Sequence, residues 1–260
     1  TGRPTPVRVT RASGMRGPEQ APVALTVGLV VVTYDSAAFV PRLVSAIAAQ
    51  TRRPDRVIVV DNASTDGTAS AAQLAGATVL RLPIGQGAWG ASQAGIRFAE
   101  RNGYRWVITV DADGQHDPAS LPLLLARQAQ ESANVVIGTC VERLSLPKRI
   151  AWQYLRMLTG LGLRDFTSGL RLYDASAMRI LATPEASLLD FQDVGVLMLL
   201  AGKGLKISET PVTMRARIEG HSRVFASWAM VARYMFNTTI LCISRLDIGS
   251  RNNAAKARGT

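Results

Sequence analysis

Four oxygen-bearing side chains occur at every second position in the stretch "VDADGQHDP", residues 110–118. Asp111 and Asp113 form an Asp-x-Asp pair, and Gln115 and Asp117 continue the spacing. Two carboxylates in one turn can reach a single hard cation such as Mg²⁺ or Mn²⁺, which keeps several waters and binds substrate phosphates. Gln115 can add an amide oxygen. The stretch therefore predicts a divalent metal site at Asp111, Asp113 and Gln115, suited to neutralising a phosphate.

The same stretch also fits a structural interpretation, in which the carboxylates only shape a turn. Asp117 stands directly before Pro118, the arrangement of an N-cap followed by proline at the first helical position. We therefore expect Asp117 to cap a helix. For Asp111 and Asp113 an Asx-type turn remains the alternative to a metal site, since short motifs often occur by chance.

The stretch "GQGAWG", residues 85–90, matches the Gly-x-Gly-x-x-Gly pattern of dinucleotide-binding proteins. It follows the third predicted strand rather than the first, and the acidic residue near the required distance, Asp111, belongs to the Asp-x-Asp turn. The pattern therefore does not favour NAD binding. We expect these glycines to permit close backbone packing at the start of a helix.

The elements that must position these side chains alternate between strand and helix. Runs rich in β-branched residues predict buried parallel strands, and apolar residues at helical spacing predict helices between them. Short alternating elements are typical of a doubly wound α/β sheet, in which ligands bind at the carboxyl ends of the strands. The expected strands cover residues 23–34, 55–61, 77–83 and 105–113, and the expected helices cover residues 37–50, 66–76 and 91–103.

Acidic residues stand at the ends of these expected strands. Asp35 follows the first strand, Asp61 ends the second, and Asp111 and Asp113 end the fourth. Because the carboxyl ends of parallel strands share one edge of a sheet, the four carboxylates are expected to lie together. This shared position indicates a binding site more strongly than any single motif does.

Beyond residue 140 the pattern changes, and basic and amphipathic segments become common. We expect a basic amphipathic segment over 147–164, a turn and short strand over 165–174, a glycine-capped helix over 188–204, and a strand leading into a basic loop over 205–223.

The stretch 227–244 is strongly apolar. As a helix its 18 residues would cover about 27 Å, just short of a bilayer core of about 30 Å. Arg233 and Asn237 would be costly at the centre of a membrane. We expect a helix at the membrane interface or in a dimer contact, with a transmembrane span as the alternative.

Composition narrows the class of partner. Lys and Arg number 30 against 19 Asp and Glu, a formal net charge of +11, which suits anionic partners. Aromatic residues make up only 6% and no basic–aromatic RNA-binding motif occurs, which argues against nucleic acid. Cys140 and Cys242 lie far apart without nearby Cys or His partners, so neither a disulfide framework nor a zinc site is expected. With no signal peptide visible, these features favour a cytoplasmic location.

Length and hydrophobicity predict one large α/β domain with appendages, since the chain has 260 residues and is 47% hydrophobic. We expect a disordered basic arm over residues 1–22, the main domain over 23–224, an apolar interface or dimerisation helix over 225–246, and a flexible basic tail over 247–260.

The motifs together resemble those of family 2 glycosyltransferases, which have the GT-A fold. Five segments occur in the order seen in that family: "VVTYDSAAFVPRLVSAIAAQ", "VIVVDNASTDGTA", "GQGAWGASQAGI", "VDADGQHDP" and "DFTSGLRLYD". The last two and the late "ETPVTMRARIEGHSR" are most similar to the polyprenol-phosphate (dolichol-phosphate) mannose or glucose synthase branch. The resemblance covers residues 25–223 and implies a GT-A, Rossmann-like, mostly parallel sheet flanked by helices, with a C-terminal amphipathic interfacial segment.

The resemblance implies a role for each matching residue. Asp61 would meet the base or ribose edge of a donor nucleotide, and the metal site would hold Mg²⁺ or Mn²⁺ against its diphosphate. Arginines would meet phosphate oxygens, which their planar fork suits. The residues implied around the nucleoside are Thr33, Tyr34, Asp35, Asp61, Asn62, Gly87 and Asp111, and those implied at an acceptor phosphate are Arg149, Arg171, Arg217, Ser222 and Arg223.

The sequence departs from the family pattern at three places. Asp35-Ser36 stands where Asn-Glu is common, and Asn62 stands where a second acidic residue is common, so the base is left open. The segment 138–140, Gly-Thr-Cys, lacks an arginine that the synthases often have there, and Arg143 is the candidate to replace it.

The resemblance and the basic segments imply inverting transfer of a hexose, mannose or glucose, from a GDP- or UDP-sugar to a polyprenyl phosphate at the cytoplasmic face of the membrane. A lipid phosphate, with a second pKa of about 6, needs no base, only cationic steering from Arg149, Arg217 or Arg223. A saccharide hydroxyl acceptor, the nearer alternative, would need a carboxylate base such as Asp193 or Asp190. The farther alternative is a non-enzymatic membrane adaptor. A homo-oligomer is compatible with either.

Overall fold

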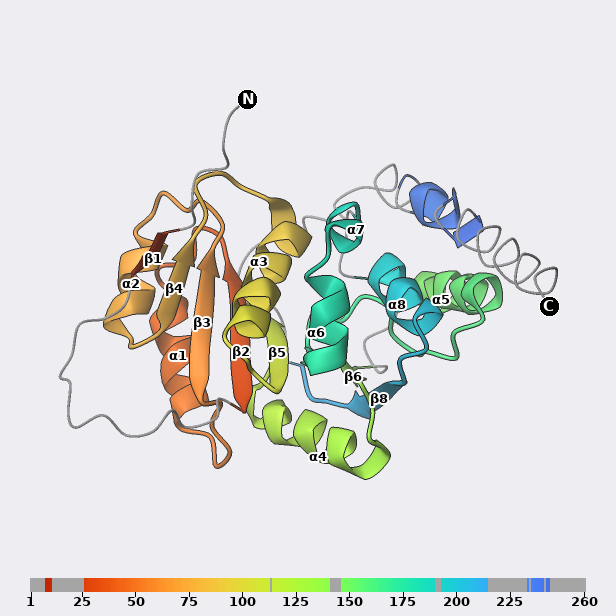
Figure 1. Ribbon diagram of the computed structural model, residues 1–260, viewed down its shortest axis with the longest axis horizontal. Coiled ribbons are helices and arrows are strands. Elements are labelled where there is room, and N and C mark those ends of the chain that lie inside the picture. The colour runs from red at the N-terminus through yellow and green to blue at the C-terminus, as the bar shows by residue number, and fades with distance from the viewer. Residues whose placement is uncertain are drawn as a thin grey trace.

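The computed structural model describes residues 8–10, 26–112, 114–140, 146–189, 193–214, 233, 235–240 and 242–243. In this part of the chain the strands form one mixed sheet with helices on both faces (Figure 1). The strand order is β1-β4-β3-β2-β5-β7-β6-β8. The strands are β1 Arg8–Thr10, β2 Val27–Thr33, β3 Arg56–Asp61, β4 Thr78–Arg81, β5 Trp106–Asp111, β6 Val135–Thr139, β7 Arg171–Asp174 and β8 Ile207–Pro211.

Helices connect these strands much as the sequence predicts. Helix α3 begins four residues before the expected start, and α8 begins later than expected, because α7 and a turn precede it. The helices are α1 Val40–Ala48, α2 Thr68–Leu74, α3 Gly87–Arg101, α4 Leu121–Glu131, preceded by the 3-10 turn η1 Pro118–Ser120, α5 Leu146–Thr159, α6 Ala175–Leu181, α7 Pro184–Ser187 and α8 Val194–Gly202.

Strands β4, β3, β2 and β5 run parallel to one another, β6 and β8 form a second parallel pair, and nearly every residue of β2 is buried. Such continuous burial arises because helices cover both faces. One face packs on α1, α2 and α4, and the other on α3, α5, α6 and α8. This arrangement confirms the predicted α/β fold with a mostly parallel sheet.

Helix α3 lies unusually close to the sheet beneath it. A Cβ atom at Gly95 would lie 2.4 Å from Cγ1 of Val30 in β2, so only glycine allows this approach. The start of α3 is thereby held over the carboxyl ends of β2 and β3.

Strand β7 runs antiparallel to both of its neighbours, β5 and β6. The first residue of β7, Arg171, therefore lies near the carboxyl ends of the parallel strands. The turn that precedes it, residues 165–170, is placed beside the end of β5. The sequence predicts the turn and the short strand, but not the direction of the strand.

The predicted disordered arm needs one correction. Residues 8–10 form β1, which pairs antiparallel with β4, so for these three residues the expectation of disorder is wrong. Pairing satisfies backbone groups along β4, which would otherwise be an edge strand, and Val9 and Thr10 are β-branched. The other residues of the arm lie outside the described ranges.

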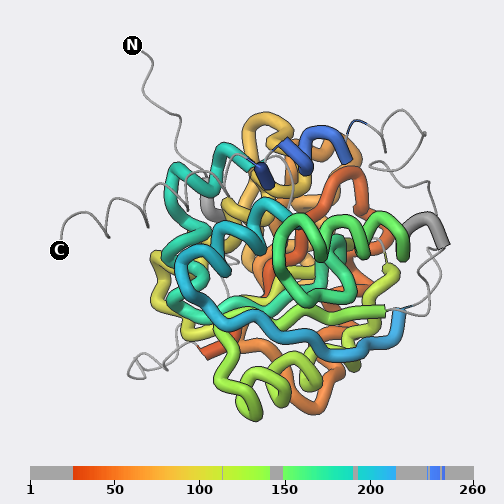
Figure 2. Tube along the Cα trace, turned by 90° about the vertical axis from the view of Figure 1, so that its right-hand side faces the viewer, coloured from red at the N-terminus to blue at the C-terminus, as the bar shows by residue number. Residues whose placement is uncertain are grey.

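At the far end of the sheet from β1, α5 and α8 lie next to each other (Figures 1 and 2). Of the apolar stretch 227–244, residues 233, 235–240 and 242–243 are described, and all of them are helical. The Tyr154 and Thr239 hydroxyl oxygens are 3.0 Å apart, which joins this helical segment to α5. Among the described residues, no helix combines the length and the apolar character needed to cross a bilayer.

Candidate active site

The residues predicted to surround the nucleoside lie at the carboxyl edge of the parallel strands. In the sheet register Thr33 pairs with Asp61, and Val32 pairs with Asp111. Three neighbouring strand ends therefore bring Thr33, Asp61 and Asp111 to one edge. Thr33 is buried and its hydroxyl donates to the Val60 carbonyl at 3.1 Å, so its side chain shapes the strand end.

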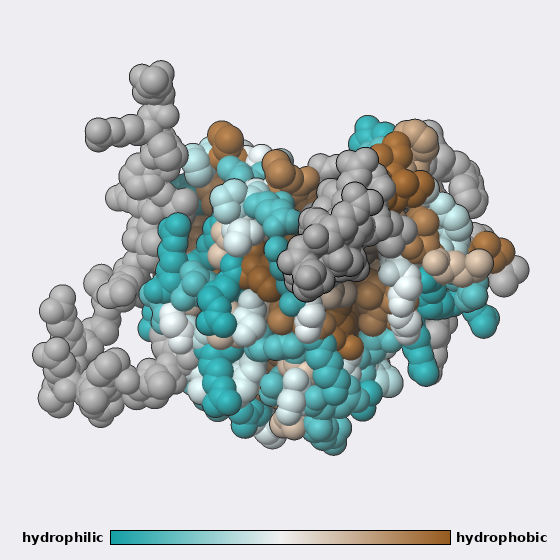
Figure 3. Space-filling view, turned by 45° about the vertical axis from the view of Figure 1, so that its right-hand side comes forward, coloured by the Kyte–Doolittle hydropathy of each residue, from teal (hydrophilic) through white to brown (hydrophobic). Residues whose placement is uncertain are grey.

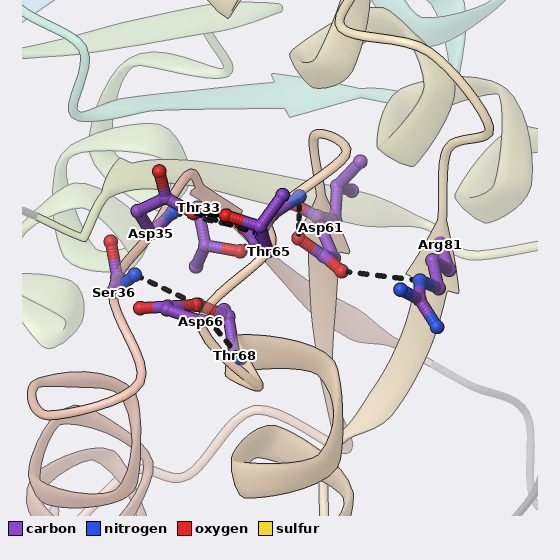
Figure 4. A network of polar contacts seen from close by, with 10 residues as sticks. Thr33, Asp35, Ser36, Asp61, Thr65, Asp66, Thr68 and Arg81 are labelled. Atoms are coloured by element: carbon purple, nitrogen blue, oxygen red, sulfur yellow. Dashed lines mark hydrogen bonds and ion pairs between the residues drawn. The ribbon is translucent and has the colours of Figure 1, made fainter.

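Two loops, residues 34–37 after β2 and 62–68 after β3, are tied together by hydrogen bonds at this edge (Figure 4). The Asp35 carboxylate accepts from the Thr65 backbone N–H at 2.9 Å, and the Ser36 backbone N–H donates to the Thr68 hydroxyl at 2.8 Å. These bonds link residues about 30 positions apart, so each loop fixes the other.

Asp66 accepts three hydrogen bonds in this network. Its Oδ2 accepts from the Ala37 backbone N–H at 3.0 Å, and its Oδ1 accepts from the Thr68 backbone N–H at 3.0 Å and from the Thr68 hydroxyl. Burial alone would raise the pKa of Asp66, but the bonds from Thr68 and Ala37 outweigh it and hold that pKa below its ordinary value. Asp66 therefore stays ionised and holds the two loops together.

Tyr34 and Asp35 project from the first of these loops. Tyr34 is 42% exposed, and Asp35 is exposed and has a φ of 45°. Aspartate tolerates this left-handed conformation better than most residues. The Asp35 backbone N–H is thereby turned to the Ser64 hydroxyl at 2.9 Å. Both predicted nucleoside residues are accessible to a ligand at this edge.

Asp61 is fully buried and carries an oxygen without a hydrogen bond. Its Oδ1 accepts from the Ser64 backbone N–H at 3.0 Å. Among the described residues its Oδ2 has no hydrogen-bond partner, and Nε of Arg81 lies 3.8 Å away, an ion-pair distance too long for a hydrogen bond. A buried carboxylate oxygen of this kind suits an N–H donor from a ligand.

Arg81 is a site residue that the sequence analysis did not single out. It ends β4, and its side chain is 66% exposed beside Asp61. The strand-end rule that selected four aspartates would also have selected it, because β4 is parallel to β3 and ends at the same edge.

Asn62 ties β3 to the glycine-rich turn that opens α3. Its Oδ1 accepts from the Gln86 backbone N–H at 2.7 Å, and its Nδ2 donates to the Gly87 carbonyl at 3.5 Å. Gly87 has a φ of 69°, which glycine adopts freely. Gly87 thus serves the turn that opens α3 through its backbone conformation, while a Cβ atom built there would have no atom within 4 Å among the described residues, so the expected close backbone packing is not seen at Gly87.

The predicted metal turn begins at the end of β5. Asp111 and Gln115 are half-buried there, and Asp113 lies outside the described residues. Asp117 accepts from the Ala119 backbone N–H at 3.1 Å and caps η1, which confirms its predicted structural role. No cluster of three or more His, Cys, Asp and Glu occurs within the described ranges, which omit Asp113. The donor types available, carboxylate and amide oxygens, fit Mg²⁺ or Mn²⁺.

The chain that follows β8 runs beside this turn. His116 and Met214 form an isolated antiparallel bridge, which brings the chain leading into the basic loop beside the metal turn. Arg217, Ser222 and Arg223 of that loop lie outside the described residues.

Two of the predicted acceptor-side residues lie in very different environments. Arg149 is exposed on α5, where it can meet a phosphate. Arg171 is fully buried, and its guanidinium donates to the carbonyls of Ser168 and Phe166 at 2.9 and 2.6 Å. The predicted phosphate contact of Arg171 is therefore wrong for this structure, because the guanidinium is buried and faces backbone carbonyls of the protein. Asp193, the candidate base, is half-buried directly before α8.

The fold defines the class of protein. Glucosyl-3-phosphoglycerate synthase from Mycobacterium tuberculosis, solved with Mn²⁺ and UDP-glucose, superimposes with a TM-score of 0.63 at 21% identity, covering 84% of this chain and 79% of that one. The same enzyme with phosphoglyceric acid gives 0.62 at 18% identity, covering 85% and 79%. The fold is therefore the GT-A glycosyltransferase fold, as predicted.

Sequence comparison places the chain within this class. The pattern of the family described as "Glycosyl transferase family 2" matches residues 29–183, and the chain belongs to this family. The undecaprenyl-phosphate mannosyltransferase of Micrococcus luteus is 34% identical over 219 residues, 78% of this chain and 86% of that protein. The polyprenol monophosphomannose synthase of Mycolicibacterium smegmatis is 29% identical over 226 residues, 78% and 79% of the two chains. The protein is a glycosyltransferase similar to polyprenol-phosphate mannose synthases, which confirms the predicted hexosyltransferase.

Proposed function

We propose that this protein transfers a hexose, mannose or glucose, with inversion, from a GDP- or UDP-sugar to a polyprenyl phosphate at a membrane surface, with Mg²⁺ or Mn²⁺ bound. The observation that carries the proposal is the sheet edge at which Asp61, with its open oxygen, and Asp111 end the two strands that flank β2. The likeness to polyprenyl-phosphate mannosyltransferases supports the acceptor class. The proposed catalytic domain covers residues 23–224.

On the donor side, three polar residues have different roles. The open oxygen of Asp61 accepts an N–H of the base, and Arg81 beside it donates to a base carbonyl. Tyr34 covers the nucleoside from the exposed loop. Because both a guanine and a uracil present an N–H beside a carbonyl, these residues fit GDP and UDP alike.

At the diphosphate, Asp111, Asp113 and Gln115 would hold the metal. A bound divalent cation neutralises the charge that develops on the leaving nucleoside diphosphate. The chain's own contribution is to hold the Asp111 carboxylate at the end of a buried strand, so that little reorganisation of this ligand is needed when the bond to the sugar breaks.

On the acceptor side, cationic residues replace a base. A phosphate monoester is largely dianionic at neutral pH, because its second pKa is about 6, and it attacks the anomeric carbon without losing a proton. Arg149, exposed on α5, and Arg217 and Arg223 of the basic loop would steer it. Asp193 is not needed for this reaction.

An exposed apolar surface beside Arg149 supports a lipid acceptor. Ile150 and Met157 of α5 are 65% and 78% exposed, and on the adjoining C-terminal helical segment Phe236 and Ile240 are 65% and 51% exposed. Figure 3 shows hydrophobic atoms gathered on the side of the molecule that carries α5. Apolar side chains on one helix face flanked by arginine suit the boundary between headgroups and acyl chains. We infer peripheral association with the cytoplasmic face of the membrane.

Two variants separate this proposal from the nearer alternative, transfer to a saccharide hydroxyl. With a short-chain polyprenyl phosphate and GDP- and UDP-hexoses, Arg217→Ala is expected to lower transfer at least tenfold, whereas Asp193→Asn changes it less than about threefold. If Asp193→Asn instead abolishes turnover while donor binding persists, Asp193 acts as a general base and the hydroxyl alternative is correct.

A calorimetric titration tests the donor half separately. Binding of GDP or UDP that strengthens when Mn²⁺ is added is the expected result, and the stronger of the two identifies the base. Binding that is indifferent to Mn²⁺ would overturn the metal dependence. The family membership leaves no support for the adaptor hypothesis.

A further inference from the structure

The turn before β7 lies directly against the Asp111 carboxylate. A Cβ atom built on Gly169 would lie 2.3 Å from Oδ2 of Asp111 and 2.9 Å from its Cγ. Gly169 does not have a positive φ, so its backbone conformation does not require glycine. Glycine is required there because the Asp111 carboxylate leaves no space for a side chain. The exact place of Gly169 therefore decides where the Asp111 carboxylate can sit.

The sheet holds this turn, residues 164–170, at two points. The hydroxyl of Thr109, two residues before Asp111 on β5, donates to the Gly169 carbonyl at 2.9 Å. On β8, Glu209 accepts from the consecutive backbone N–H groups of residues 164 and 165 at 2.8 and 3.0 Å. Thr109 and Asp111 lie on the same face of their strand, because side chains alternate along it.

Arg171 supplies a third attachment, from inside the protein. Its Nε donates to the Ser168 carbonyl at 2.9 Å and a terminal nitrogen donates to the Phe166 carbonyl at 2.6 Å. Arg171 pairs with Thr109 across β5 and β7, and so shares the face of the sheet that carries Asp111.

Burying this guanidinium is costly. Arg171 is fully buried, its other terminal nitrogen has no hydrogen bond, and no carboxylate of the described residues forms an ion pair with it. Removing a cation from water costs several kcal/mol unless its partners compensate, so an apolar residue would fill the same space more cheaply. We therefore expect the buried guanidinium to do something that an apolar side chain cannot do, namely to donate hydrogen bonds to two carbonyls in a fixed geometry.

We propose that Arg171 is a positioning residue for the metal ligand Asp111. Its planar fork grips two carbonyls of the 164–170 turn and holds Gly169 against the Asp111 carboxylate, which selects the carboxylate orientation that the metal needs. Lysine cannot replace it, because one ammonium does not bridge two carbonyls in a fixed geometry. The inference rests on the proposed function, since it takes a divalent cation at Asp111.

The test is Mn²⁺ affinity, measured by the electron paramagnetic resonance signal of free Mn²⁺ in the presence of GDP or UDP and without any acceptor. Arg171→Lys is expected to weaken Mn²⁺ binding about tenfold, the usual size of effect for a residue that orients a ligand. Nucleotide binding without metal is expected to stay unchanged, and transfer activity to recover partly at high Mn²⁺.

Arg97→Lys is the matched control. Arg97 also donates to backbone carbonyls, those of Ala182 and Thr183 at 3.0 and 3.4 Å, but it holds the segment between α6 and α7 instead of the 164–170 turn. Its replacement is expected to leave Mn²⁺ affinity unchanged. An equal loss in both variants would assign Arg171 a general structural role and overturn the inference.

Gly169→Ala tests the same mechanism without touching Arg171. Its methyl group must displace the Asp111 carboxylate, so a loss of Mn²⁺ affinity at least as large as that of Arg171→Lys is expected. This variant decides the matter if Arg171→Lys does not fold. Wild-type protein that binds no Mn²⁺ would overturn the metal dependence of the proposed function. Wild-type Mn²⁺ affinity in Gly169→Ala, or in folded Arg171→Lys, would overturn only the inference drawn here.

Discussion

The two sides of Asp111 are built in opposite ways. On the donor side, Asp35, Thr65 and Asp66 of loops 34–37 and 62–68 are exposed, and short polar side chains accept hydrogen bonds from backbone N–H groups of the opposite loop. On the acceptor side, the 164–170 turn is held from within by the buried Arg171, while α5 turns apolar side chains outward. Asp35 and Asp66, which join the donor-side loops, are therefore exposed, whereas Arg171, which holds the acceptor-side turn, is buried.

This difference corresponds to the two substrates of the proposed reaction. A nucleotide-sugar would arrive from water at the exposed Tyr34, Asp35 and Arg81, beside strand ends that already converge. A lipid phosphate would arrive from a membrane, which requires an apolar exterior on that side, and there Arg171, which fixes the 164–170 turn, is buried. The following experiments break or sharpen this contrast, from the largest expected effect to the smallest.

Asp111 lies between the donor side and the acceptor side, so its replacement should remove both sugar transfer and metal-dependent nucleotide binding. Asp111→Asn is expected to lower sugar transfer by roughly 10²–10³, because a neutral amide binds a hard cation poorly and charge stabilisation in the transition state is lost. Mn²⁺-dependent nucleotide binding should disappear with it.

Asp117→Asn is the control, measured in the same initial-rate assay. Asparagine is as good an N-cap as aspartate, so η1 and the rate should both be kept. Undiminished transfer by Asp111→Asn at saturating Mn²⁺ would contradict the role of Asp111.

The acceptor side can be broken without touching the donor side. Ile150→Glu combined with Met157→Glu places two charges on the exposed face of α5, and binding to vesicles of mixed zwitterionic and anionic lipid should fall about tenfold or more, since each buried apolar side chain contributes about 1.5–3 kcal/mol. Slow donor hydrolysis should be unchanged.

Leu74→Glu is the matched control for this experiment, because Leu74 is 91% exposed but lies on α2, on the opposite side of the sheet from α5. It should co-sediment with vesicles as the wild type does. Equal losses in both proteins would show that charge alone, and not the α5 surface, governs membrane binding.

The smallest expected effect is a pair of opposite pH dependences. The pKa of Asp66 is held below 3.8 despite some burial, by its hydrogen bonds, so its stabilising contribution is present above pH 3.8 and lost as pH falls through the folded-state value. Burial raises the pKa of Glu209 above 4.5, and the backbone hydrogen bonds from Asp165 and Arg164 lower it by less. The contribution of Glu209 to folding stability is therefore present below pH 4.5 and is lost as pH rises through the folded-state pKa.

Urea unfolding over a pH series checks both signs. The stability advantage of wild type over Asp66→Asn should shrink as pH falls below about 4, whereas its stability relative to Glu209→Gln should decline as pH rises above about 5. The same sign in both comparisons would mean that the two carboxylates do not differ in environment as described.

Much of the donor side could be predicted from sequence because its signals are local. A β-branched run, a strand end and an acidic residue follow one another within a few positions, and parallel strands bring such ends together. The strand-end positions of Asp61 and Asp111 follow in this way, and the N-cap role of Asp117 is confirmed. Arg81 does not follow, because the strand expected over 77–83 ends at Arg81 in the structure and the strand-end rule considered carboxylates alone.

The acceptor side could not be predicted in the same way. The resemblance predicts that Arg171 contacts a phosphate, and nothing near Arg171 in the sequence indicates whether its guanidinium faces solvent or backbone carbonyls. Its environment depends on β7 running antiparallel between β5 and β6 and on Glu209 and Thr109, which are 38 and 62 residues away.

The sequence by itself determined the order of strands and helices, the acidic strand ends and the glycine-rich turn, because each follows from residues adjacent in the chain. The tertiary structure alone decided which arginine is buried, which glycine touches Asp111 and which helix face is left apolar and exposed. Those outcomes depend on contacts between segments far apart in the chain, and no local pattern encodes a contact of that kind.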